Sequence, residues 1–484
     1  MSKLKQINQE IYARSYYDFF LDSLLVLEPT LKFENNWHIK YLCDELQEAC
    51  ERVGKGENKL YDIVINIPPR SMKSTIVTIS LNAWLWIKYP SLRLISTSYS
   101  SSLATEHCQK SRALIESNWY QELFSEYFSL LKDNNQKTNF ENNKTGHRQI
   151  SSVGTGTTGK GGDIIIFDDL LTPTLAGAEN GRETMSNYFF NTMYNRLNNP
   201  KTGLRIIVEQ RLHENDLTGL ITQKGMKVKH ICLPVIDGEN VSPSQARINY
   251  KDGMLFNTRF DKETLEDFKL RLGSSEFATQ YLQMPAPDTG LIIKEEWLKQ
   301  RFNASDLSES IVRHFMSDTA YGKDNNSDYC ATICYSEKDN HIYIWDYFNQ
   351  KLAFNEYIPA HKSFLTANGY TNESKDEFEP KATGISVIQV LQSEGINAIA
   401  AKNPVDSKEV RARAKTPILE AKRVHFLNGK NWDELIHQCK TFPNCKNDDL
   451  VDCLIGCLDY WKVGFKPKTQ NEMLEMFNRI NNKI

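Results

Sequence analysis

The sequence predicts an α/β protein made of two successive domains, on three observations. In the first half, short apolar runs alternate with helical stretches, at 62–67, 93–97, 163–167 and 204–208. Continuous apolar strands of this kind suit a parallel-rich central sheet that helices cover on both faces. In the second half, strand-like runs follow one another closely, as in an antiparallel meander, at 311–316, 329–335 and 341–347. The length of 484 residues also exceeds one ordinary hydrophobic core.

Changes in pattern divide the chain into four parts. Residues 1–55 place apolar side chains at helical spacing and predict a helical lead-in. The first α/β domain, with a C-terminal subdomain and linker, is expected over 56–290, which ends in a turn-rich stretch. A second domain of alternating helices and strands is expected over 305–463. The polar segment 464–484 is expected to form a tail.

Composition and charge are those of an ordinary globular protein. The net charge of −3 does not indicate a nucleic-acid partner, so any contact with DNA must come from local basic patches. The ten cysteines are scattered without a secretory signal, so buried free thiols are a better explanation than disulfides or a zinc site. No segment approaches the roughly 20 apolar residues that span a bilayer, and we expect a soluble intracellular protein.

The segment Ile-Pro-Pro-Arg-Ser-Met-Lys-Ser-Thr at 67–75 lies between a predicted strand and a helix-like run. A loop in this place directs backbone N–H groups at phosphate, with Lys73 on the terminal phosphates and the Ser74 hydroxyl on Mg²⁺. Ile67 and Met72 occupy the two usual glycine positions, so the segment alone fits a proline-punctuated turn equally well. As a Walker A phosphate loop it would bind ATP through Arg70, Ser71, Met72, Lys73, Ser74 and Thr75.

A second motif strengthens the nucleotide hypothesis. The apolar strand at 163–167 runs into Asp168 and Asp169, about 95 residues after Lys73. At the carboxyl end of a strand, the first acid can complete the magnesium shell while the second polarises an attacking water. A buried strand capped by two solvated aspartates is the simpler alternative. Together with Lys73 and Ser74, the two acids favour an ATPase.

A glycine-rich segment precedes that strand. Residues 154–162 contain five glycines, which allow positive φ and a close approach to a ligand. Lys160 within it could neutralise phosphate charge. An ordinary surface loop explains the same composition.

The second domain carries separated acidic groups. Asp318 ends its first strand, Glu379 precedes a short glycine-containing segment, and Asp448, Asp449 and Asp452 begin a helix-like run. Carboxylates brought together repel one another, so their convergence would need cations such as two Mg²⁺ or Mn²⁺ ions, which cleave phosphodiesters. From the residues alone, unrelated solvated acids are the more economical explanation.

A basic stretch lies between these acids. Lys408, Arg411, Arg413 and Lys415 could grip DNA phosphates beside them. The alternative is the charged face of an ordinary helix.

Several motifs, taken in order, make the sequence similar to the large terminase subunit of tailed bacteriophages. The resemblance covers roughly residues 35 to 463. Its motifs are Pro68-Pro69-Arg70 with Lys73-Ser74, the segment 158–161 leading into Asp168-Asp169, the segment 210–219 (Gln-Arg-Leu-His-Glu-Asn-Asp-Leu-Thr-Gly), and the segment 277–283 (Phe-Ala-Thr-Gln-Tyr-Leu-Gln).

The resemblance implies a P-loop ATPase domain followed by a ribonuclease-H-like nuclease domain. It implies that Arg70 stabilises charge on the γ-phosphate, and that Gln210 and Arg211 belong to a motif coupling hydrolysis to DNA movement. It also implies that Asp318, Glu379 and Asp449, with Asp448, hold the nuclease metals, whereas Asp452 has a supporting place.

We therefore expect a subunit of a viral DNA-packaging motor, which translocates duplex DNA into the procapsid by ATP hydrolysis and cuts concatemeric DNA. Its expected cofactors are ATP and Mg²⁺, with Mn²⁺ possible at the nuclease. Its expected partners are double-stranded DNA, a portal ring, a small terminase subunit and further copies of itself in a ring. The expected location is the cytoplasm of the infected bacterium and, transiently, the procapsid. Two alternatives are a helicase or repair-type ATPase fused to a nuclease, and a capsid-docking adaptor with an inactive site.

Overall fold

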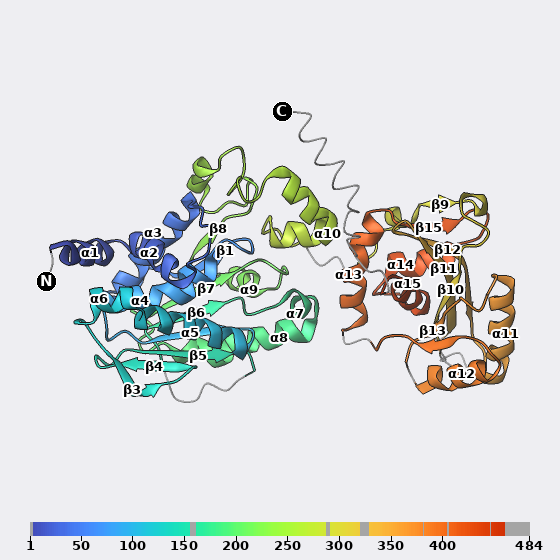
Figure 1. Cartoon of the computed structure of the whole chain (residues 1–484), viewed down its shortest axis with the longest axis horizontal. Helices are drawn as coiled ribbons and strands as arrows, with labels where there is room; N and C mark the ends of the chain where they lie inside the picture. The colour runs from blue at the N-terminus through green and yellow to red at the C-terminus, as the bar shows by residue number, and fades with distance from the viewer. Residues whose placement is uncertain are drawn as a thin grey trace. The chain divides into compact units, whose positions relative to one another are not determined.

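The computed structural model forms two compact units, Met1–Asp288 and Thr289–Ile484 (Figure 1). It describes residues 3–154, 161–286, 291–319, 329–380, 382–403, 406–445 and 447–459. Lys160 and the predicted tail at 464–484 therefore lie outside the described residues.

The first unit is built on an eight-stranded sheet with the order β3-β4-β5-β2-β6-β7-β1-β8. From β5 to β8, neighbouring strands run parallel, whereas β3, β4 and β5 pair antiparallel at one edge. The strands are β1 (Asp62–Asn66), β2 (Leu94–Ser98), β3 (Leu130–Asn135), β4 (Asn139–Asn142), β5 (His147–Ser152), β6 (Ile164–Asp168), β7 (Leu204–Glu209) and β8 (Val228–Cys232). The predicted parallel-rich sheet is confirmed.

Helices cover both faces of this sheet because its central strands are apolar on each side. In β6, Ile164 and Ile166 belong to one core, whereas Ile165 and Phe167 belong to the other. The first core is closed by α1 (Lys3–Arg14), α2 (Tyr16–Leu27), α3 (Trp37–Gly54), α4 (Leu81–Lys88), α5 (Ser101–Glu116) and α6 (Asn118–Phe124). The second is closed by α7 (Pro173–Gly177), α8 (Glu179–Asn187), a π-helical turn (Tyr188–Met193) and α9 (Leu217–Gln223).

The first unit ends in a small separate core. It is formed by residues that follow β8 and by α10 (Lys262–Gln280), around Val235, Phe260 and Phe277. Gly273 interrupts α10 with φ 78° and ψ 161°, so the helix changes direction there. A left-handed φ at this point favours glycine, which has no Cβ.

The second unit contains a seven-stranded sheet with the order β14-β13-β10-β11-β12-β15-β9. The strands β10 (His314–Asp318), β11 (Cys330–Lys338) and β12 (His341–Gln350) form the predicted antiparallel meander. Next to β10, β13 (Asp376–Phe378) and β14 (Ala398–Ala400) run parallel to it. This arrangement is the ribonuclease-H-like topology expected for the second domain. Beyond β12 lie β15 (Val424–Leu427) and then the edge strand β9 (Arg301–Phe302).

The first strand of the meander starts later than predicted. The prediction was 311–316, but β10 begins at His314, which pairs with β11, and the pairing with β13 begins at Phe315. Asp318 is the last residue of this strand, as predicted.

Five α-helices complete the second unit within the described residues. They are α11 (Phe354–Ala367), α12 (Ala382–Ser393), α13 (Lys408–Glu420), α14 (Asp433–Thr441) and α15 (Asp449–Asp459). The helix α15 is buried along almost its whole length and shares a core with β10, β11 and β12.

The part of the chain that the structure describes contains no helix that is both long and apolar enough to cross a membrane. The ten cysteines are free thiols, and all but Cys445 are buried.

Candidate functional site

The loop that follows β1 has an unusual backbone. Arg70 and Met72 have φ values of 65° and 63°, in the left-handed region that side chains with a Cβ rarely adopt. Such residues cost on the order of 1–3 kcal/mol each and persist where the surrounding structure enforces them. The Ser71 hydroxyl donates to the Pro68 carbonyl at 2.9 Å and closes the loop. The chain thus adopts a glycine-type conformation at Met72 without glycine.

The two motifs predicted to bind nucleotide meet at one edge of the first sheet. The Nζ atom of Lys73 lies 2.8 Å from Oδ1 of Asp169, and the Ser74 hydroxyl donates to Oδ1 of Asp168 at 3.0 Å. The strands β1 and β6 are parallel with β7 between them, so their carboxyl ends lie at the same edge. Residues 94 to 96 positions apart in sequence become direct neighbours there.

Asp168 is enclosed by side chains that the sequence did not indicate. Its Oδ2 accepts a hydrogen bond from the Thr78 hydroxyl at 2.6 Å and lies 3.5 Å from Nδ1 of His107 on α5. Burial, and then the charge of Asp169, raise the pKa of Asp168. Thr78 lies in the π-helical segment Thr75–Ser80, which begins directly after Ser74, and both hydroxyls donate to the Asp168 carboxylate. His107 comes from α5, and no sequence pattern around it indicates a contact with Asp168.

The residues predicted for coupling, Gln210 and Arg211, follow β7 directly. The backbone N–H of Gln210 donates to Oδ1 of Asp169 at 3.3 Å. This is the same oxygen that Lys73 contacts. The Arg211 side chain donates to Asp216 through Nε. The preceding Glu209 is buried, and burial, followed by the nearby Asp216, raises its pKa to about 8.

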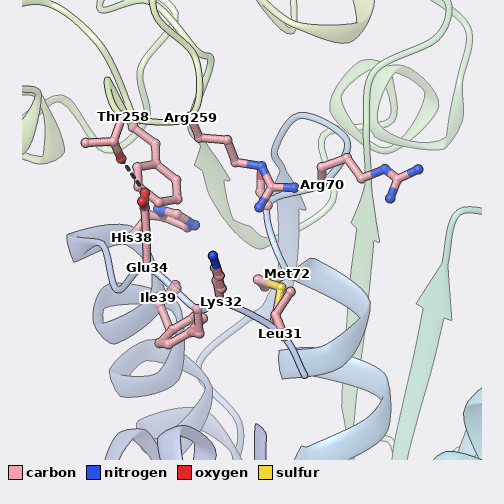
Figure 2. Close-up of a pocket in the computed structure, with 12 residues that line it drawn as sticks. Leu31, Lys32, Glu34, His38, Ile39, Arg70, Met72, Thr258 and Arg259 are labelled. Carbon is pink, nitrogen blue, oxygen red and sulfur yellow. Dashed lines mark hydrogen bonds between the residues drawn. The ribbon is translucent and has the colours of Figure 1, made fainter. Parts of the chain in front are cut away.

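A cavity of about 150 Å³ borders the phosphate loop. Its walls come from residues 31–39, 70–72 and 256–259, and Figure 2 shows Lys32 and Arg259 directed into the space beside Met72. The exposed Arg70 side chain points away from that space. Apolar contacts come from Leu31, Ile39, Met72 and Phe256. Apart from residues 70–72, the lining of this cavity was not expected from the sequence.

The donor set at this edge suits a magnesium-bound nucleoside triphosphate. Lys73 supplies a cation, Ser74 a hydroxyl and Asp168 a buried carboxylate, which are the groups that bind phosphates and Mg²⁺. Ser71 and Thr75 flank them, and Arg70 is exposed beside them.

In the second unit the predicted acids also gather at one edge. The strands β10 and β13 are parallel neighbours, and the Glu379 amide donates to the Ser317 carbonyl at 3.0 Å. Asp318 and Glu379 therefore lie at the carboxyl ends of two adjacent strands, β10 and β13. The beginning of α15 packs against this sheet, and Asp318, Asp449 and Asp452 are each at most 7% exposed.

Cations of α13 lie against these acids. Lys408 Nζ lies 3.0 Å and 3.1 Å from the two oxygens of Asp448 and also contacts Asp452. Arg411 is 3.7 Å from Glu379 and 3.7 Å from Asp459. Lys415 pairs with Asp459 at 3.0 Å, and Arg413 is partly buried on the same helix. Lys408, Arg411 and Lys415, which were predicted to bind DNA, thus form ion pairs with carboxylates of their own unit.

Asp452, for which only a supporting place was expected, is buried among the other acids and contacts Lys408. Burial raises its pKa, Lys408 opposes that shift, and the charges of Asp448 and Glu379 add to it. Within the described residues, no three His, Cys, Asp or Glu side chains are arranged to hold a metal ion. The predicted acids therefore do not fit a preformed metal site in this arrangement, and Lys408 and Arg411 balance part of their charge.

No family model matches the chain, and no curated protein matches it in sequence. Solved structures of large terminases resemble it. The large terminase of a thermophilic bacteriophage, also solved in complex with ADP, is 11% identical, with 82% of this chain and 93% of that chain covered and a TM-score of 0.46. The HK97 bacteriophage large terminase is 10% identical, with coverages of 92% and 100% and a TM-score of 0.37. The large terminase nuclease of the thermophilic phage G20c, with bound magnesium, is 12% identical, with coverages of 36% and 100% and a TM-score of 0.28. The solved structures that resemble this chain are large terminases, the family whose motifs its sequence resembles.

Proposed function

We propose that this chain is a subunit of a viral DNA-packaging motor, an ATPase that translocates duplex DNA and an endonuclease that cuts it. The observation that carries the ATPase half is the contact of Lys73 and Ser74 with Asp169 and Asp168 at the edge of a parallel sheet. A cation, a hydroxyl and two carboxylates with separate tasks are what hydrolysis of a nucleoside triphosphate requires.

The two acids have different environments and therefore different roles. Ser74 and Asp168 would hold the magnesium ion, which neutralises phosphate charge when bound. Asp169 is more exposed than Asp168 and orients the attacking water. Its present partner Lys73 is the natural ligand of the terminal phosphates, so Lys73 leaves Asp169 when it engages them. The exposed Arg70 can turn toward charge that develops on the γ-phosphate.

The cavity beside the phosphate loop supports the same proposal. Its apolar side chains suit the base of a nucleotide, and Lys32 and Arg259 add positive charge toward the phosphates. The cavity is bounded by residues 31–39, so we propose that the helical lead-in forms part of the nucleotide site.

For the second unit we propose a metal-dependent endonuclease. Support comes from the ribonuclease-H-like topology, from Asp318 and Glu379 at the ends of adjacent strands, and from Asp449 at the start of α15, which packs against β10. The metals proposed are Mg²⁺ or Mn²⁺. Because Lys408 and Arg411 now contact the acids, the carboxylates have to rearrange before they can serve as ligands.

We further propose the assembly that the resemblance to large terminase subunits implies. The chain would act as a ring of copies on a portal ring of the procapsid, with double-stranded DNA in the channel and a small terminase subunit selecting the DNA. We propose the cytoplasm of the infected bacterium as its location.

Paired variants of the full chain test the two activities. Lys73→Ala is expected to lower ATP hydrolysis at least about 100-fold, because it removes a preorganised cation from developing negative charge, and to leave plasmid cleavage intact. Asp318→Ala is expected to abolish Mg²⁺- or Mn²⁺-dependent cleavage of supercoiled plasmid and to leave the ATPase intact. Each variant is the control for the other.

The outcomes separate the proposal from its alternatives. Loss of both activities in either variant would contradict two independent sites. Unwinding of duplex DNA would favour a helicase or repair enzyme, and absence of DNA-stimulated ATP hydrolysis in the wild type would favour a docking adaptor.

A further inference from the structure

Two successive peptide groups connect Asp169 to the end of α10. The backbone N–H of Gln210 donates to Oδ1 of Asp169 at 3.3 Å. The next backbone N–H, that of Arg211, donates to the side-chain Oε1 of Gln283 at 2.9 Å. Gln283 lies three residues after α10, where the chain leaves the first unit toward the second, which begins at Thr289. Asp169 and Gln283 are therefore joined by a path two residues long.

The loop that carries both amides is held as one body. Asp216 is 1% exposed, and its carboxylate accepts from Arg211 Nε at 2.9 Å, from the Leu212 amide at 3.0 Å and from the Gly219 amide at 3.0 Å. A Cβ atom at Gly219 would collide with the Glu214 carbonyl oxygen, so the turn is closed without spare space. A displacement at Gln210 is therefore passed on to Arg211 without being absorbed inside the loop.

The other side of this loop is anchored to α9. The Glu209 carboxyl accepts from the Thr218 amide at 2.9 Å and from the Thr218 hydroxyl at 2.7 Å. Asn66 at the end of β1 donates to the same hydroxyl at 3.0 Å. The loop thus rests on the strand that leads into the phosphate loop.

Gln283 is fixed in one orientation. Its side chain is 3% exposed, its Nε2 donates to the Gln280 carbonyl, and its Oε1 is left to accept from Arg211. Its backbone has φ 55°, a left-handed conformation that is uncommon for glutamine. Just before it, Tyr281 stacks on Phe277 with ring planes 10° apart, which ties the position to the core around α10. Gln283 is strained and buried, and both its side-chain Nε2 and its Oε1 are hydrogen-bonded. A shift of the Arg211 backbone would therefore move Gln283 with it.

We propose that Gln283 is a positioning residue that transmits the state of Asp169 to the segment leaving the first unit. The proposal rests on the nucleotide site proposed above. Lys73 and the Gln210 amide share one oxygen of Asp169. When Lys73 turns to phosphate, that oxygen loses its cation and the contact with the Gln210 amide changes. The loop carries the change to Arg211, and Gln283 carries it to residues 284–286.

Amide hydrogen exchange of the full chain tests this path. Exchange is measured with and without a non-hydrolysable ATP analogue and Mg²⁺, in wild type, Gln283→Leu and the matched control Gln280→Leu. The control residue is the last residue of α10, three positions before Gln283, and its side chain donates to Glu276. In wild type and control, the analogue is expected to protect residues 67–76 and to change exchange at 281–286 about two- to tenfold, the effect of about one hydrogen bond. In Gln283→Leu, the protection at 67–76 should remain and the change at 281–286 should disappear.

The outcomes distinguish the path from the nucleotide site. An equal change at 281–286 in wild type and Gln283→Leu would overturn the role of Gln283, as would no change there in wild type while 67–76 is protected. No protection at 67–76 in wild type would reject the nucleotide site and the path with it. If Gln283→Leu does not fold, Gln283→Asn replaces it, because its shorter amide cannot span the distance to Arg211 and keeps the polarity.

Discussion

At the scale of single residues, backbone strain accompanies the proposed chemistry. Arg70, Met72, Asp169 and Gln283 are among the residues with left-handed backbones. Glycine would adopt such a conformation more readily at 70 and 72, yet the chain retains side chains there. Arg70 and Met72 shape the phosphate loop, and Asp169 and Gln283 lie at the two ends of the path through residues 210 and 211. These four strained residues therefore belong to one connected region.

Glu209 gives a prediction at this scale. Its pKa is about 8 in the folded protein, above the ordinary glutamate value, because it is buried and next to Asp216. A raised folded pKa contributes stability that is complete below the unfolded pKa of about 4.3 and is lost as pH rises to about 8. Glu209→Gln, which stays neutral, should be within about 1 kcal/mol of the wild-type stability near pH 5. At pH 8 to 9 it should be more stable than wild type by on the order of a few kcal/mol.

Thermal unfolding of both proteins across pH 5 to 9 measures this difference. The comparison cancels the contributions of titrating groups distant from Glu209, since both proteins contain them. A constant difference between the two proteins across that range would show that Glu209 is ionised in the folded state throughout.

At the scale of elements, the sequence predicted what depends on continuous apolar runs. The strands β1, β2, β6 and β7 are buried at every residue, and their runs were recognisable for that reason. The antiparallel strands β3 to β5 were missed, because polar residues dominate them and no alternation distinguishes them from loops.

The candidate sites divide in the same way. Lys73-Ser74 and Asp168-Asp169 could be found because each pair follows a strand. His107 and Gln283 could not, because their contacts with Asp168 and Arg211 join distant elements and leave no local pattern. The ion pairs of Lys408 and Arg411 depend on how α13 lies beside α15, which spacing along the chain does not determine.

The helix α13 gives a prediction at the scale of elements. Lys408 contacts Asp448 and Asp452, whereas Lys415 on the same helix contacts Asp459. If the acids are metal ligands, Lys408 competes with the metal for them. Lys408→Gln should therefore increase Mn²⁺ affinity at least about tenfold, since a unit charge at contact distance is worth more than the roughly 1.4 kcal/mol that tenfold requires.

Calorimetric titration of the nucleotide-free full chain with Mn²⁺ measures that affinity, with Lys415→Gln as the matched control. Equal affinities in the two variants would mean that Lys408 does not compete for the metal site. Weaker binding in Lys408→Gln would mean instead that the lysine helps to assemble the site.

At the scale of the whole molecule, the chain is two folding units, each with cores made from its own residues. The larger core of the first unit combines α1 to α6 with the sheet, so the helical lead-in belongs to the structure that holds the phosphate loop. The second unit packs α15, which carries its acids, against its own meander. Each proposed activity is thus supported by a separate core, and ligands should stabilise the units separately.

Differential scanning calorimetry of the full chain tests this separation. A ligand that binds only folded protein stabilises it by about 2.7 kcal/mol at a concentration 100 times its Kd. An ATP analogue with Mg²⁺ should therefore raise the midpoint of one of two unfolding transitions by several degrees, since about 1 kcal/mol corresponds to roughly 2–4 °C in units of this size. Lys73→Ala should lose that shift, and Lys408→Gln should retain it. A single transition that moves as a whole would show instead that the units unfold as one, and hydrolysis in the first unit would then bear directly on the stability of the second.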